Sequence, residues 1–533
     1  MQRSKAKDMK TKYRNLPIGI QSFKEIREEN YLYVDKTDIV WHLVNMGKKY
    51  NYLSRPRRFG KSVLVDTLCS YLEGRKNLFE GLKIMELENE WKQYPVIRLD
   101  MSRGGATAAT IRSYLNQCFK EYEEQYAIVP DPTAMLADRF HTLIKTAYEK
   151  TGLKVSVLID EYDSPLQHSW QTPEHEACTD VYREVFAILK ADDEYEKFIF
   201  ITGITKFTQI SLFSSLNNLT NISFLPEYAA ACGITEQEIV ENFTLELQEM
   251  AEVNSWTIDE AHDRLKTFYD GYHFSRRNMT DIYNPFSLIN ALDSQEIGNF
   301  WASSGATTLL PKFVNDMELQ LGSFDHCYID KFTLESSDVI GGGAELFLYQ
   351  SGYLTIKEYD EGIYTLGFPN QEVKQALYQL VLPALTQRSA SMAVSAQSLL
   401  GKMMQIANLP EAMKALKALV ADVPYSNKKL ESMDMEERYR LIISTIFNAI
   451  GLQVEVERML STGRIDIVAR NFRYIYVIEL KLTNNGGLEA AAQQIVKNKY
   501  TEPFKADKRE VIALAIELDN NGKGLVDWKE VDC

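Results

Sequence analysis

The sequence predicts an α/β protein in which a doubly wound parallel sheet comes first, a helical region follows, and a smaller α/β domain ends the chain. Three observations support this fold class. At 533 residues the chain is too long for one hydrophobic core. Between residues 49 and 207, apolar runs alternate with amphipathic helical patterns, as in a parallel sheet covered on both faces. Near the C-terminus, consecutive strand patterns and a helix indicate a second sheet.

The apolar runs of the first region are the predicted strands KYNYL, PVIRLDM, VSVLID and FIFITG, separated by helical segments such as 61–73 and 133–150. After Leu225 helices dominate. Residues 346–377 predict helix, strand, a turn, strand and helix, an order that resembles a winged helix. From Met435 the pattern is a helix, the strands LQVEVERM, GRIDIVAR and YIYVIELKL, a helix, and a last strand EVIALAIEL. The predicted domains are therefore 1–225, 226–424 and 425–533.

Composition narrows the class of protein. Nearly all of the net charge of −15 lies before residue 425, which argues against broad nonspecific DNA coating by that part. The six cysteines include no C-x-x-C pair, and the seven histidines have no metal-type spacing. The basic N-terminus has no apolar segment behind it, and no apolar run reaches the roughly 18 residues of a membrane helix. We therefore expect a soluble cytoplasmic protein with no membrane partner.

One segment, YLSRPRRFGKSVLVDTL at 52–68, ends like a phosphate-binding loop. The usual pattern is G-x-x-x-x-G-K-[ST], and here Arg55 stands where the first glycine should be. Such a loop binds phosphate because backbone N–H groups at a helix N-terminus converge on the anion, while a lysine adds charge and a hydroxyl binds Mg²⁺. Gly60, Lys61 and Ser62 supply the end of this pattern between a predicted strand and a helix at 62–72.

A second motif completes the predicted ATP site. The strand VSVLID ends in Asp160 and Glu161, where the Asp can hold Mg²⁺ through water and the Glu can deprotonate the attacking water. A further strand ends at Thr202, with Lys206 and Gln209 close behind as polar sensors of the γ-phosphate. The alternative is that the acidic pair is only a strand end followed by a solvated helix cap.

Two arginines beside the loop, Arg57 and Arg58, could bind phosphates bidentately or could form structural ion pairs. The residues predicted to contact ATP or its Mg²⁺ are Arg57, Arg58, Phe59, Gly60, Lys61, Ser62, Asp160 and Thr202, with Ser62 and Asp160 at the metal and Glu161 as the catalytic base.

Many ordered motifs resemble the bacterial AAA-ATPase-like proteins whose C-terminal domain is of the PD-(D/E)XK nuclease type. They are RPRRFGKS, YVDKT, LIDEYD, ITGITKF, SLFSSLNNLTNIS, FYDGYHF, YNPFSLINAL, FLYQSGYLTIK and LGFPNQEV, which span residues from about 14 to about 505. The resemblance implies a P-loop NTPase core followed by a helical lid and a winged helix, and in that family Arg replaces the first loop glycine as a rule. It places FYDGYHF in the lid, where Tyr272 or His273 either approaches the nucleotide or, as we favour, packs between helices.

The C-terminal strands carry the nuclease motif. Nucleases of this type gather carboxylates around one or two Mg²⁺ ions and place a lysine near the attacking water. The segment Gly463-Arg464-Ile465-Asp466 ends one strand of a predicted hairpin, and Glu479-Leu480-Lys481 follows on the next strand. Because strand side chains alternate, Glu479 and Lys481 share one face while Leu480 faces the core. The alternative, a surface ion pair, is disfavoured because both acids lie within apolar strands.

Two further residues of the site follow from the resemblance. Glu436 matches the family's helix glutamate and is expected at the metal, with Glu437 as the alternative. Gln494, followed by Tyr500, matches a glutamine that contacts the metal-bound water or the backbone. The predicted catalytic residues are Glu161, Asp466, Glu479, Lys481 and Gln494; the predicted ligands of the nuclease metal are Glu436, Asp466 and Glu479.

The predicted function is an ATP-binding, ATP-hydrolysing protein that regulates or drives a Mg²⁺-dependent nuclease, with Mn²⁺ as an alternative metal. The resemblance suggests DNA as substrate and defence against phages or mobile elements, and a homo-oligomer is possible. One alternative is a non-enzymatic ATP-dependent switch or scaffold with a vestigial nuclease fold. Another is a DNA-binding regulator acting through the winged helix, which is disfavoured because its recognition segment 370–384 has one Lys and no Arg.

Overall fold

The computed structural model forms two compact units. The first is Met1–Leu309 with His326–Pro369, and the second is Leu310–Asp325 with Asn370–Cys533. The predicted division at 225 and 424 is finer and stays a prediction; the boundary at 369 lies inside the predicted middle region. The structure describes residues 15–131, 133–205, 219–303, 324–336, 343–386, 390–421 and 433–533.

A five-stranded parallel sheet forms the centre of the first unit, with strand order β2-β3-β4-β1-β5. The strands are β1 (Tyr50–Ser54), β2 (Val96–Asp100), β3 (Val155–Asp160), β4 (Glu196–Gly203) and β5 (Thr220–Asn221). Every residue of β3 is buried, as its apolar run predicts. The two-residue strand β5 was not predicted, because it is too short to give an alternation pattern.

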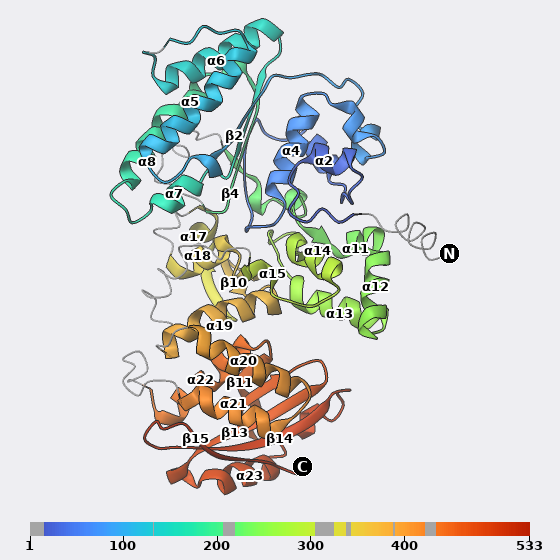
Figure 1. The fold of residues 1–533 in the computed structure, drawn as a ribbon, viewed down its shortest axis with the longest axis vertical. Helices are drawn as coiled ribbons and strands as arrows, with labels where there is room; N and C mark the ends of the chain where they lie inside the picture. Colours follow the sequence, from blue (N-terminus) through green and yellow to red (C-terminus); the bar gives the residue numbers. More distant parts are fainter. Residues whose placement is uncertain are drawn as a thin grey trace. The chain divides into compact units, whose positions relative to one another are not determined.

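Helices cover both faces of this sheet, which confirms the predicted doubly wound α/β fold. Figure 1 shows α5, α6 and α8 on one side of the sheet and α2 and α4 on the other. The helices are α2 (Phe23–Glu28), α3 (Thr37–Asn45), α4 (Lys61–Leu72), α5 (Ala108–Gln125), α6 (Leu136–Thr151), α7 (Ser164–Ser169), α8 (His175–Phe186) and α9 (Ile188–Ala191).

The first unit continues as a helical subregion with its own apolar core, which includes Phe243, Met250, Leu265, Tyr283 and Leu288. Its elements are β6 (Ile234–Thr235), α11 (Glu236–Asn242), α12 (Thr244–Asn254), α13 (Ile258–Tyr269), β7 (Ile282–Tyr283), α14 (Pro285–Ser294) and α15 (Phe300–Ser303). An antiparallel sheet of order β8-β10-β9 follows, with α17 and α18. These are β8 (Cys327–Asp330), α17 (Lys331–Ser336), α18 (Gly343–Ser351), β9 (Thr355–Asp360) and β10 (Ile363–Gly367).

The predicted order of helix, strand, turn, strand and helix over 346–377 is confirmed by α18, β9, β10 and α19. However, α19 (Gln371–Thr386) belongs to the second unit, where it packs against α22 (Met435–Ala449). The winged-helix interpretation of this segment stays a prediction.

The second unit is built on a five-stranded sheet of order β11-β12-β13-β14-β15, mixed in direction because only β13 and β14 run parallel. On one face, Ile495 of α23 belongs to the same apolar cluster as Ile465 and Val477 of the sheet. Helix α22 contacts β11, β12 and β13. The elements are α20 (Ala390–Gln405), α21 (Leu409–Ala421), β11 (Gln453–Leu460), β12 (Gly463–Arg470), β13 (Tyr474–Leu482), α23 (Gly487–Lys497), β14 (Glu510–Leu518) and β15 (Leu525–Glu530).

Two predictions about this sheet were wrong. The segment at 510–518 is not the last strand, because β15 follows it and pairs with it in antiparallel orientation. The sequence of β15, LVDWKE, is mostly polar, so a search for apolar runs does not predict this strand. Asp466 also does not end its strand, since it is the fourth residue of β12. Within the described part of the chain, no helix is long and apolar enough to cross a membrane.

Candidate nucleotide-binding and nuclease sites

The phosphate-type loop connects β1 to α4. Helix α4 begins at Lys61, one residue earlier than predicted, and its N-cap residue is Gly60 with φ 88°. Arg58 also has a positive φ, of 65°. These two left-handed residues turn the chain so that the first N–H groups of α4 are presented at the end of β1, which is an arrangement suited to an anion.

Lys61 is buried, and its ammonium donates to the loop itself. Its Nζ lies 3.0 Å from the carbonyl oxygen of Arg55 and 3.0 Å from that of Pro56. Burial lowers the pKa of Lys61, while the carboxylates of Glu161 and Asp160 act in the opposite direction. The lysine is therefore held inside the loop by neutral carbonyl dipoles, within the electrostatic reach of the acidic pair.

The unusual Arg55 is a structural residue in this conformation. Its guanidinium is buried and donates to three main-chain carbonyls, those of Ser54 at 2.8 Å, Ser223 at 3.0 Å and Tyr228 at 2.8 Å. It also lies 4.0 Å from the ring centroid of Phe274. Burial lowers its pKa to about 10. Arg55 thus fixes the segment after β5 to the loop, and nothing in this geometry requires a glycine at its position.

The other loop residues also contact the rest of the first unit. The carbonyl of Arg57 accepts a hydrogen bond from Trp301 Nε1 at 3.2 Å. The exposed Arg58 guanidinium lies 5.0 Å from the ring centroid of Phe286. The Arg57 contact is made by its main chain and the Arg58 contact by an exposed side chain, so the choice between phosphate binding and structural ion pairs stays a prediction.

Phe59 packs into an aromatic group rather than pointing into solvent. Its buried ring lies 4.7 Å from the ring of Tyr272 and 5.4 Å from that of Phe274, in edge contacts. Tyr272 Oη in turn donates to the carbonyl of Gly352 at 3.0 Å, and a Cβ on Gly352 would lie 2.5 Å from Pro56 Cβ. A nucleotide contact by Phe59 would therefore have to use its main chain.

Tyr272 and His273 of FYDGYHF pack within the first unit, but their partners lie in the phosphate-type loop, in β9 and just before β7 rather than between helices. Besides the Tyr272 contact with Phe59, the His273 main-chain N–H donates to Thr355 Oγ1 at 2.7 Å, and His273 Nε2 lies 2.7 Å from Asp281 Oδ1. Both ring nitrogens and the main chain of His273 thus have partners in the first unit, because Nδ1 also contacts the Ile356 carbonyl at 2.8 Å. An approach of either residue to the nucleotide stays a prediction.

The acidic pair lies at the same edge of the sheet as the loop. Strand β4 separates β1 from β3, and the register pairs Ser54 with Gly203. Thr202 Oγ1 donates to Asp160 Oδ1, which also accepts from the Glu161 main-chain N–H at 3.1 Å. Among the described residues none donates a hydrogen bond to Asp160 Oδ2, so this oxygen suits a water on Mg²⁺. With the half-buried Ser62 hydroxyl, the donor set fits that ion.

Glu161 occupies a strained backbone position. Its φ is 47°, a left-handed conformation that non-glycine residues rarely adopt. Burial raises the pKa of its half-buried carboxyl; Lys61 lowers it, and Asp160 raises it further. A carboxylate with a raised pKa at this edge is suited to accept a proton from water.

Asp163 is a buried residue that sequence reasoning missed. Its Oδ2 accepts from the main-chain N–H groups of Ile204 at 3.0 Å and Thr205 at 2.6 Å, from Thr205 Oγ1 at 2.7 Å and from Gln167 Nε2 at 2.6 Å. It therefore joins the turn after β3 to the end of β4. The predicted sensors Lys206 and Gln209 lie outside the described residues.

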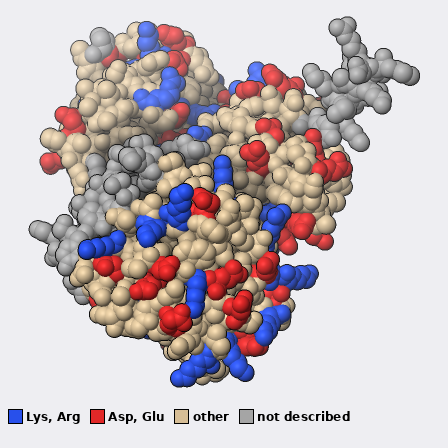
Figure 2. Space-filling view, turned by 60° about the horizontal axis from the view of Figure 1, so that its bottom comes forward, with Lys and Arg blue, Asp and Glu red and all other residues tan. Residues whose placement is uncertain are grey.

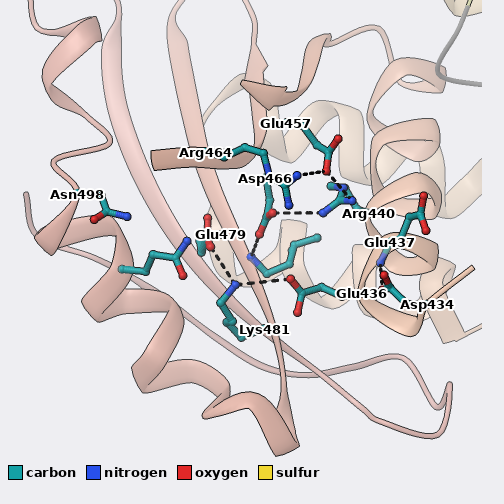
Figure 3. Close-up of polar contacts among 12 residues, drawn as sticks. Asp434, Glu436, Glu437, Arg440, Glu457, Arg464, Asp466, Glu479, Lys481 and Asn498 are labelled. Carbon is teal, nitrogen blue, oxygen red and sulfur yellow. Dashed lines mark hydrogen bonds and ion pairs between the residues drawn. The ribbon is translucent and has the colours of Figure 1, made fainter. Parts of the chain in front are cut away.

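The second candidate site lies on β12 and β13 of the second unit (Figure 3). Asp466 and Glu479 are both buried, and Asp466 Oδ2 accepts from the Leu480 main-chain N–H at 2.9 Å. Burial raises the pKa of Glu479 to about 8, with the nearby Asp466 carboxylate adding to the effect. Glu479 Oε2 is buried and has no hydrogen-bond partner, which is the condition of an oxygen that awaits a ligand.

Lys481 joins β13 to the helix. Its Nζ lies 3.1 Å from Glu479 Oε1 and 3.5 Å from Glu436 Oε1. Burial lowers the pKa of Lys481, but the surrounding carboxylates of Glu479, Asp466 and Glu436 outweigh it, so the pKa is raised. Figure 3 shows Glu436 directed toward Lys481 and Glu437 directed away from it. Of the two candidate glutamates, the structure therefore brings Glu436 into the site.

Arg440 is a further member that sequence reasoning missed. Its Nη1 lies 3.4 Å from Asp466 Oδ1, and its Nη2 lies 2.8 Å from Glu457 Oε1. Glu457 also pairs with Arg464 at 2.8 Å. Because Arg440 follows Glu436 by four residues in a predicted helix, the sequence did carry a signal that the two share a face.

Gln494 reaches the site indirectly. Its Nε2 donates to Tyr500 Oη at 3.1 Å, and Tyr500 Oη donates to the Arg464 carbonyl at 2.8 Å, two residues before Asp466. In this conformation Gln494 contacts the Tyr500 hydroxyl and not the backbone itself, and its predicted contact with the metal-bound water or the backbone stays a prediction.

A divalent ion fits the carboxylates of this site. Among the described residues, no three His, Cys, Asp or Glu side chains gather in a metal-binding group, and Glu436 is paired with Lys481. Mg²⁺, however, keeps several waters and commonly uses one or two protein carboxylates. Asp466 and Glu479, with the unpartnered oxygen of Glu479, supply that number.

The first unit has the features of a P-loop NTPase fold: a loop of the phosphate-binding type and an acidic strand end. The second sheet, with an Asp and a Glu-x-Lys, has those of a PD-(D/E)XK fold. Family models agree. Residues 17–213 match the predicted AAA-ATPase family (AAA-ATPase_like), and residues 434–528 match the PD-(D/E)XK nuclease superfamily. The chain is also 30% identical over 524 residues to an uncharacterized protein in the vnfD 5' region of Azotobacter chroococcum mcd 1, covering 96% of this chain and 98% of that protein. The chain belongs to this family of AAA-ATPase-like proteins with a C-terminal PD-(D/E)XK domain.

Two solved structures align with much lower similarity. The Orc1 protein of Aeropyrum pernix in complex with DNA aligns at 14% identity and a TM-score of 0.23, covering 64% of this chain and 90% of that one. Cdc6p from Pyrobaculum aerophilum aligns at 11% identity and a TM-score of 0.25, covering 66% and 93%. At such TM-scores these alignments carry no argument about this chain.

Proposed function

We propose that this protein binds and hydrolyses ATP and that its nucleotide state regulates or drives a Mg²⁺-dependent nuclease acting on DNA. The observation that carries the nuclease part is the buried oxygen of Glu479 without a partner, beside Asp466 and Lys481 on neighbouring strands. Burying such an oxygen is costly, and beside Asp466 and Lys481 a divalent ion would supply the partner that it lacks.

At the ATP site, Lys61 exchanges its bonds to the Arg55 and Pro56 carbonyls for phosphate oxygens. This exchange is favourable because a phosphate carries full negative charge whereas a carbonyl is a dipole. Ser62 and Asp160 would hold the Mg²⁺, which neutralises phosphate charge when bound. Glu161 accepts the proton of the attacking water, helped by its raised pKa.

At the nuclease site, Asp466 and Glu479 would hold the divalent ion, which lowers the pKa of water and polarises the phosphodiester when bound. Lys481 positions the attacking water with its ammonium, which Glu436 and Glu479 orient. Gln494 keeps Tyr500 on the Arg464 carbonyl and so steadies the strand that carries Asp466.

The visible surface of the second unit supports localised DNA contacts. On the face shown in Figure 2, Lys and Arg side chains are interspersed with Asp and Glu and form no continuous basic patch. Arg464, a half-exposed arginine close to the site, is therefore a better candidate for a phosphate contact than the surface as a whole.

DNA cleavage by the full-length chain tests the nuclease assignment. We expect wild type to cleave DNA in Mg²⁺ or Mn²⁺ and both Asp466→Ala and Lys481→Ala to abolish cleavage. The matched controls Asp527→Ala and Lys497→Ala change exposed residues of β15 and α23 and should cleave normally. Cleavage that persists unchanged in both site variants contradicts the assignment.

ATP binding is tested separately by calorimetry. Lys61→Ala should weaken binding by about 100-fold or more, because it removes the ammonium that meets the phosphates, while Lys76→Ala, exposed in the same unit, should not. Equal affinity in Lys61→Ala would overturn the loop assignment. Comparing cleavage with and without ATP then tests coupling: wild type that binds ATP but never cleaves DNA would favour the scaffold alternative.

The compartment and the biological setting are part of the same proposal. None of the six cysteines, all of which lie in described residues, forms a disulfide, which supports a reducing compartment such as the cytoplasm. Defence against phages or mobile elements is the setting that the family resemblance suggests; infection of cells that carry wild type or Asp466→Ala tests it, since equal phage yields would contradict it.

A further inference from the structure

The Arg440 guanidinium lies between two carboxylates of the nuclease-type site. It contacts Asp466 Oδ1 at 3.4 Å and Glu457 Oε1 at 2.8 Å, and its side chain is only 11% exposed (Figure 3). We propose that Arg440 is a positioning residue that occupies the place of the divalent cation at Asp466, and that the cation must displace it in order to bind. The proposal rests on the proposed nuclease function and adds a control on metal loading.

Helix α22 places this arginine by its spacing. Glu436 and Arg440 are one helical turn apart and therefore share a face, which contacts β12 and β13. Glu436 reaches Lys481 on β13, while Arg440 reaches Asp466 on β12. One face of a single helix thus gives a carboxylate to the site's lysine and a guanidinium to its aspartate.

Both oxygens of Asp466 are engaged in this conformation. Oδ2 accepts from the Leu480 main-chain N–H at 2.9 Å, and Oδ1 faces Arg440. The main-chain bond fixes the carboxylate on the sheet and can remain when a cation binds. The Arg440 contact is the one that a cation at Oδ1 has to replace, because two positive charges cannot share that oxygen without strong repulsion.

Glu457 is built as a tether for Arg440. The β11–β12 pairing includes Val456 with Ile467 and Arg458 with Ile465, and it omits the intervening pair of Glu457 and Asp466. Glu457 has φ 53° at this position inside the strand. A non-glycine residue in that conformation stores strain, and such residues cluster at functional sites.

The two distances decide which contact yields. At 2.8 Å the Glu457 ion pair is close, whereas at 3.4 Å the Asp466 contact is at the limit of a hydrogen bond. A cation that takes Asp466 therefore releases the weaker contact, and Arg440 stays attached to Glu457 beside the site. Glu457 pulls the arginine away from Asp466 and in this way favours metal binding.

This arrangement predicts effects of opposite sign for two neighbouring substitutions. Arg440→Gln removes the competitor and should raise the affinity for a divalent cation. Glu457→Gln loosens the tether, lets Arg440 pair more fully with Asp466, and should lower that affinity. If the two substitutions acted only by disturbing the structure, the affinity for the cation would fall in both variants. In the Arg440→Gln background, Glu457→Gln should have little effect, because its action passes through the arginine.

The experiment is a titration of the full-length protein with Mn²⁺, without DNA or nucleotide, in which free Mn²⁺ is measured by electron paramagnetic resonance. Binding at this site is the part that Asp466→Ala removes. Relative to wild type we expect affinity about tenfold higher in Arg440→Gln and severalfold lower in Glu457→Gln, as for coupled charges in one network. Arg440→Lys, which keeps the charge, should stay near wild type.

Arg458→Gln is the matched control. This substitution changes the net charge by the same amount as Arg440→Gln, and Arg458 follows Glu457 directly in β11. Arg458, however, pairs with Glu455 at 2.7 Å and not with Asp466. Its Mn²⁺ affinity should equal that of wild type. A rise in Arg458→Gln equal to that in Arg440→Gln would mean that net charge alone controls affinity, and would overturn the proposal.

Failure of this inference and failure of the proposed function give different results. If wild type and Asp466→Ala bind the same amount of Mn²⁺, no metal binds at this site, and both the inference and the proposed function are overturned. Wild type that binds Mn²⁺ and cleaves DNA, with unchanged or weaker binding in Arg440→Gln, overturns the inference alone. If Arg440→Gln does not fold, the half-exposed Glu457→Gln decides: unchanged or tighter binding there also overturns the inference.

Discussion

The two candidate sites hold their cationic side chains in different ways. In the loop of the first unit, Lys61 and Arg55 donate to main-chain carbonyls. In the second unit, Lys481 and Arg440 are paired with carboxylates. A carbonyl leaves the charge of its donor uncompensated, whereas a carboxylate cancels it. The loop is therefore prepared for an anion, whereas the cationic side chains of the nuclease-type site are already paired, and a divalent cation at Asp466 would have to replace Arg440.

The largest expected effect tests whether the loop depends on the hydrogen bonds from Arg55 to main-chain carbonyls. Arg55→Gly restores the glycine of the usual loop pattern, yet it should destabilise the protein by about 3–5 kcal/mol, because it leaves a cavity and three buried carbonyls without their donor. Urea unfolding of the full chain measures this. Arg58→Gly is the control: Arg58 is exposed with φ 65°, so glycine there should cost little or relieve strain. Equal stability of Arg55→Gly and wild type would show that the loop does not depend on the Arg55 contacts.

The next effect tests the dependence of the second site on charge. Glu436→Gln weakens the orientation of Lys481 and should slow DNA cleavage by about 10- to 100-fold, as for residues that orient a metal site. Glu437→Gln changes the adjacent acid, which points away from Lys481, and should cleave at the wild-type rate (Figure 3). Initial rates in Mg²⁺ measure both. If the two variants are equally impaired, Lys481 does not depend on the Glu436 pair.

A smaller effect concerns the support behind the loop. Gly352→Ala puts a Cβ 2.5 Å from Pro56 Cβ and should cost about 1–2 kcal/mol more than Gly362→Ala, besides weakening ATP binding. Both glycines have φ above 90°, but Gly362 has nothing within 4 Å of the added Cβ, so the pair separates the clash from backbone strain. Calorimetry with ATP and urea unfolding measure the two parts. Identical behaviour of the two variants would show that Pro56 does not need this contact.

The last effect is a slope of stability with pH, and it arises at the opposite end of the first unit's sheet. There, Glu196 is buried, accepts from Tyr50 Oη at 2.8 Å, and has its pKa raised by burial to about 8. From pH 4.3 or so up to 8 the unfolded chain has lost a proton that the folded chain keeps, so the free energy of unfolding falls as pH rises, by up to about 1.4 kcal/mol per pH unit. The stability that the protonated Glu196 carboxyl contributes is fully present below about pH 4.3 and is lost as the pH rises to about 8.

Glu196→Gln should remove this slope and raise stability at neutral pH, while Glu194→Gln, exposed two residues earlier, should leave it. Urea unfolding at a series of pH values measures it. A slope that survives in Glu196→Gln would assign the pH dependence to another group.

Sequence patterns predicted the elements whose burial is uniform. VSVLID is buried at every position, so its apolar run alone indicates a central strand. By contrast, β5 has two residues and β15 is mostly polar, and neither gives a pattern, because edge strands are defined by pairing rather than by burial. The order of elements could thus be predicted, but the edges of both sheets could not.

The same limit applies to the sites. Asp466, Glu479 and Lys481 were identified from the motif, and strand alternation puts Glu479 and Lys481 on one face. Arg55, Asp163 and Arg440 were not assigned their observed partners, because each contacts groups far away in the sequence or on another element. A motif tells which residue types a site contains; it does not tell which long-range contacts keep them in place.

The Trp301 and Gly352 contacts with the loop bear on when this protein becomes competent. The Trp301 indole bonds to the Arg57 carbonyl across 244 residues of sequence, and Gly352 packs on Pro56 from still farther along the chain. Contacts of such sequence separation form late in folding, since a long loop must close first. On the ribosome, every strand of the central sheet has been synthesised once β5 is complete, whereas the phosphate loop reaches its final surroundings only after residue 352 has been synthesised. ATP would then be a ligand of the finished first unit and not of the nascent chain.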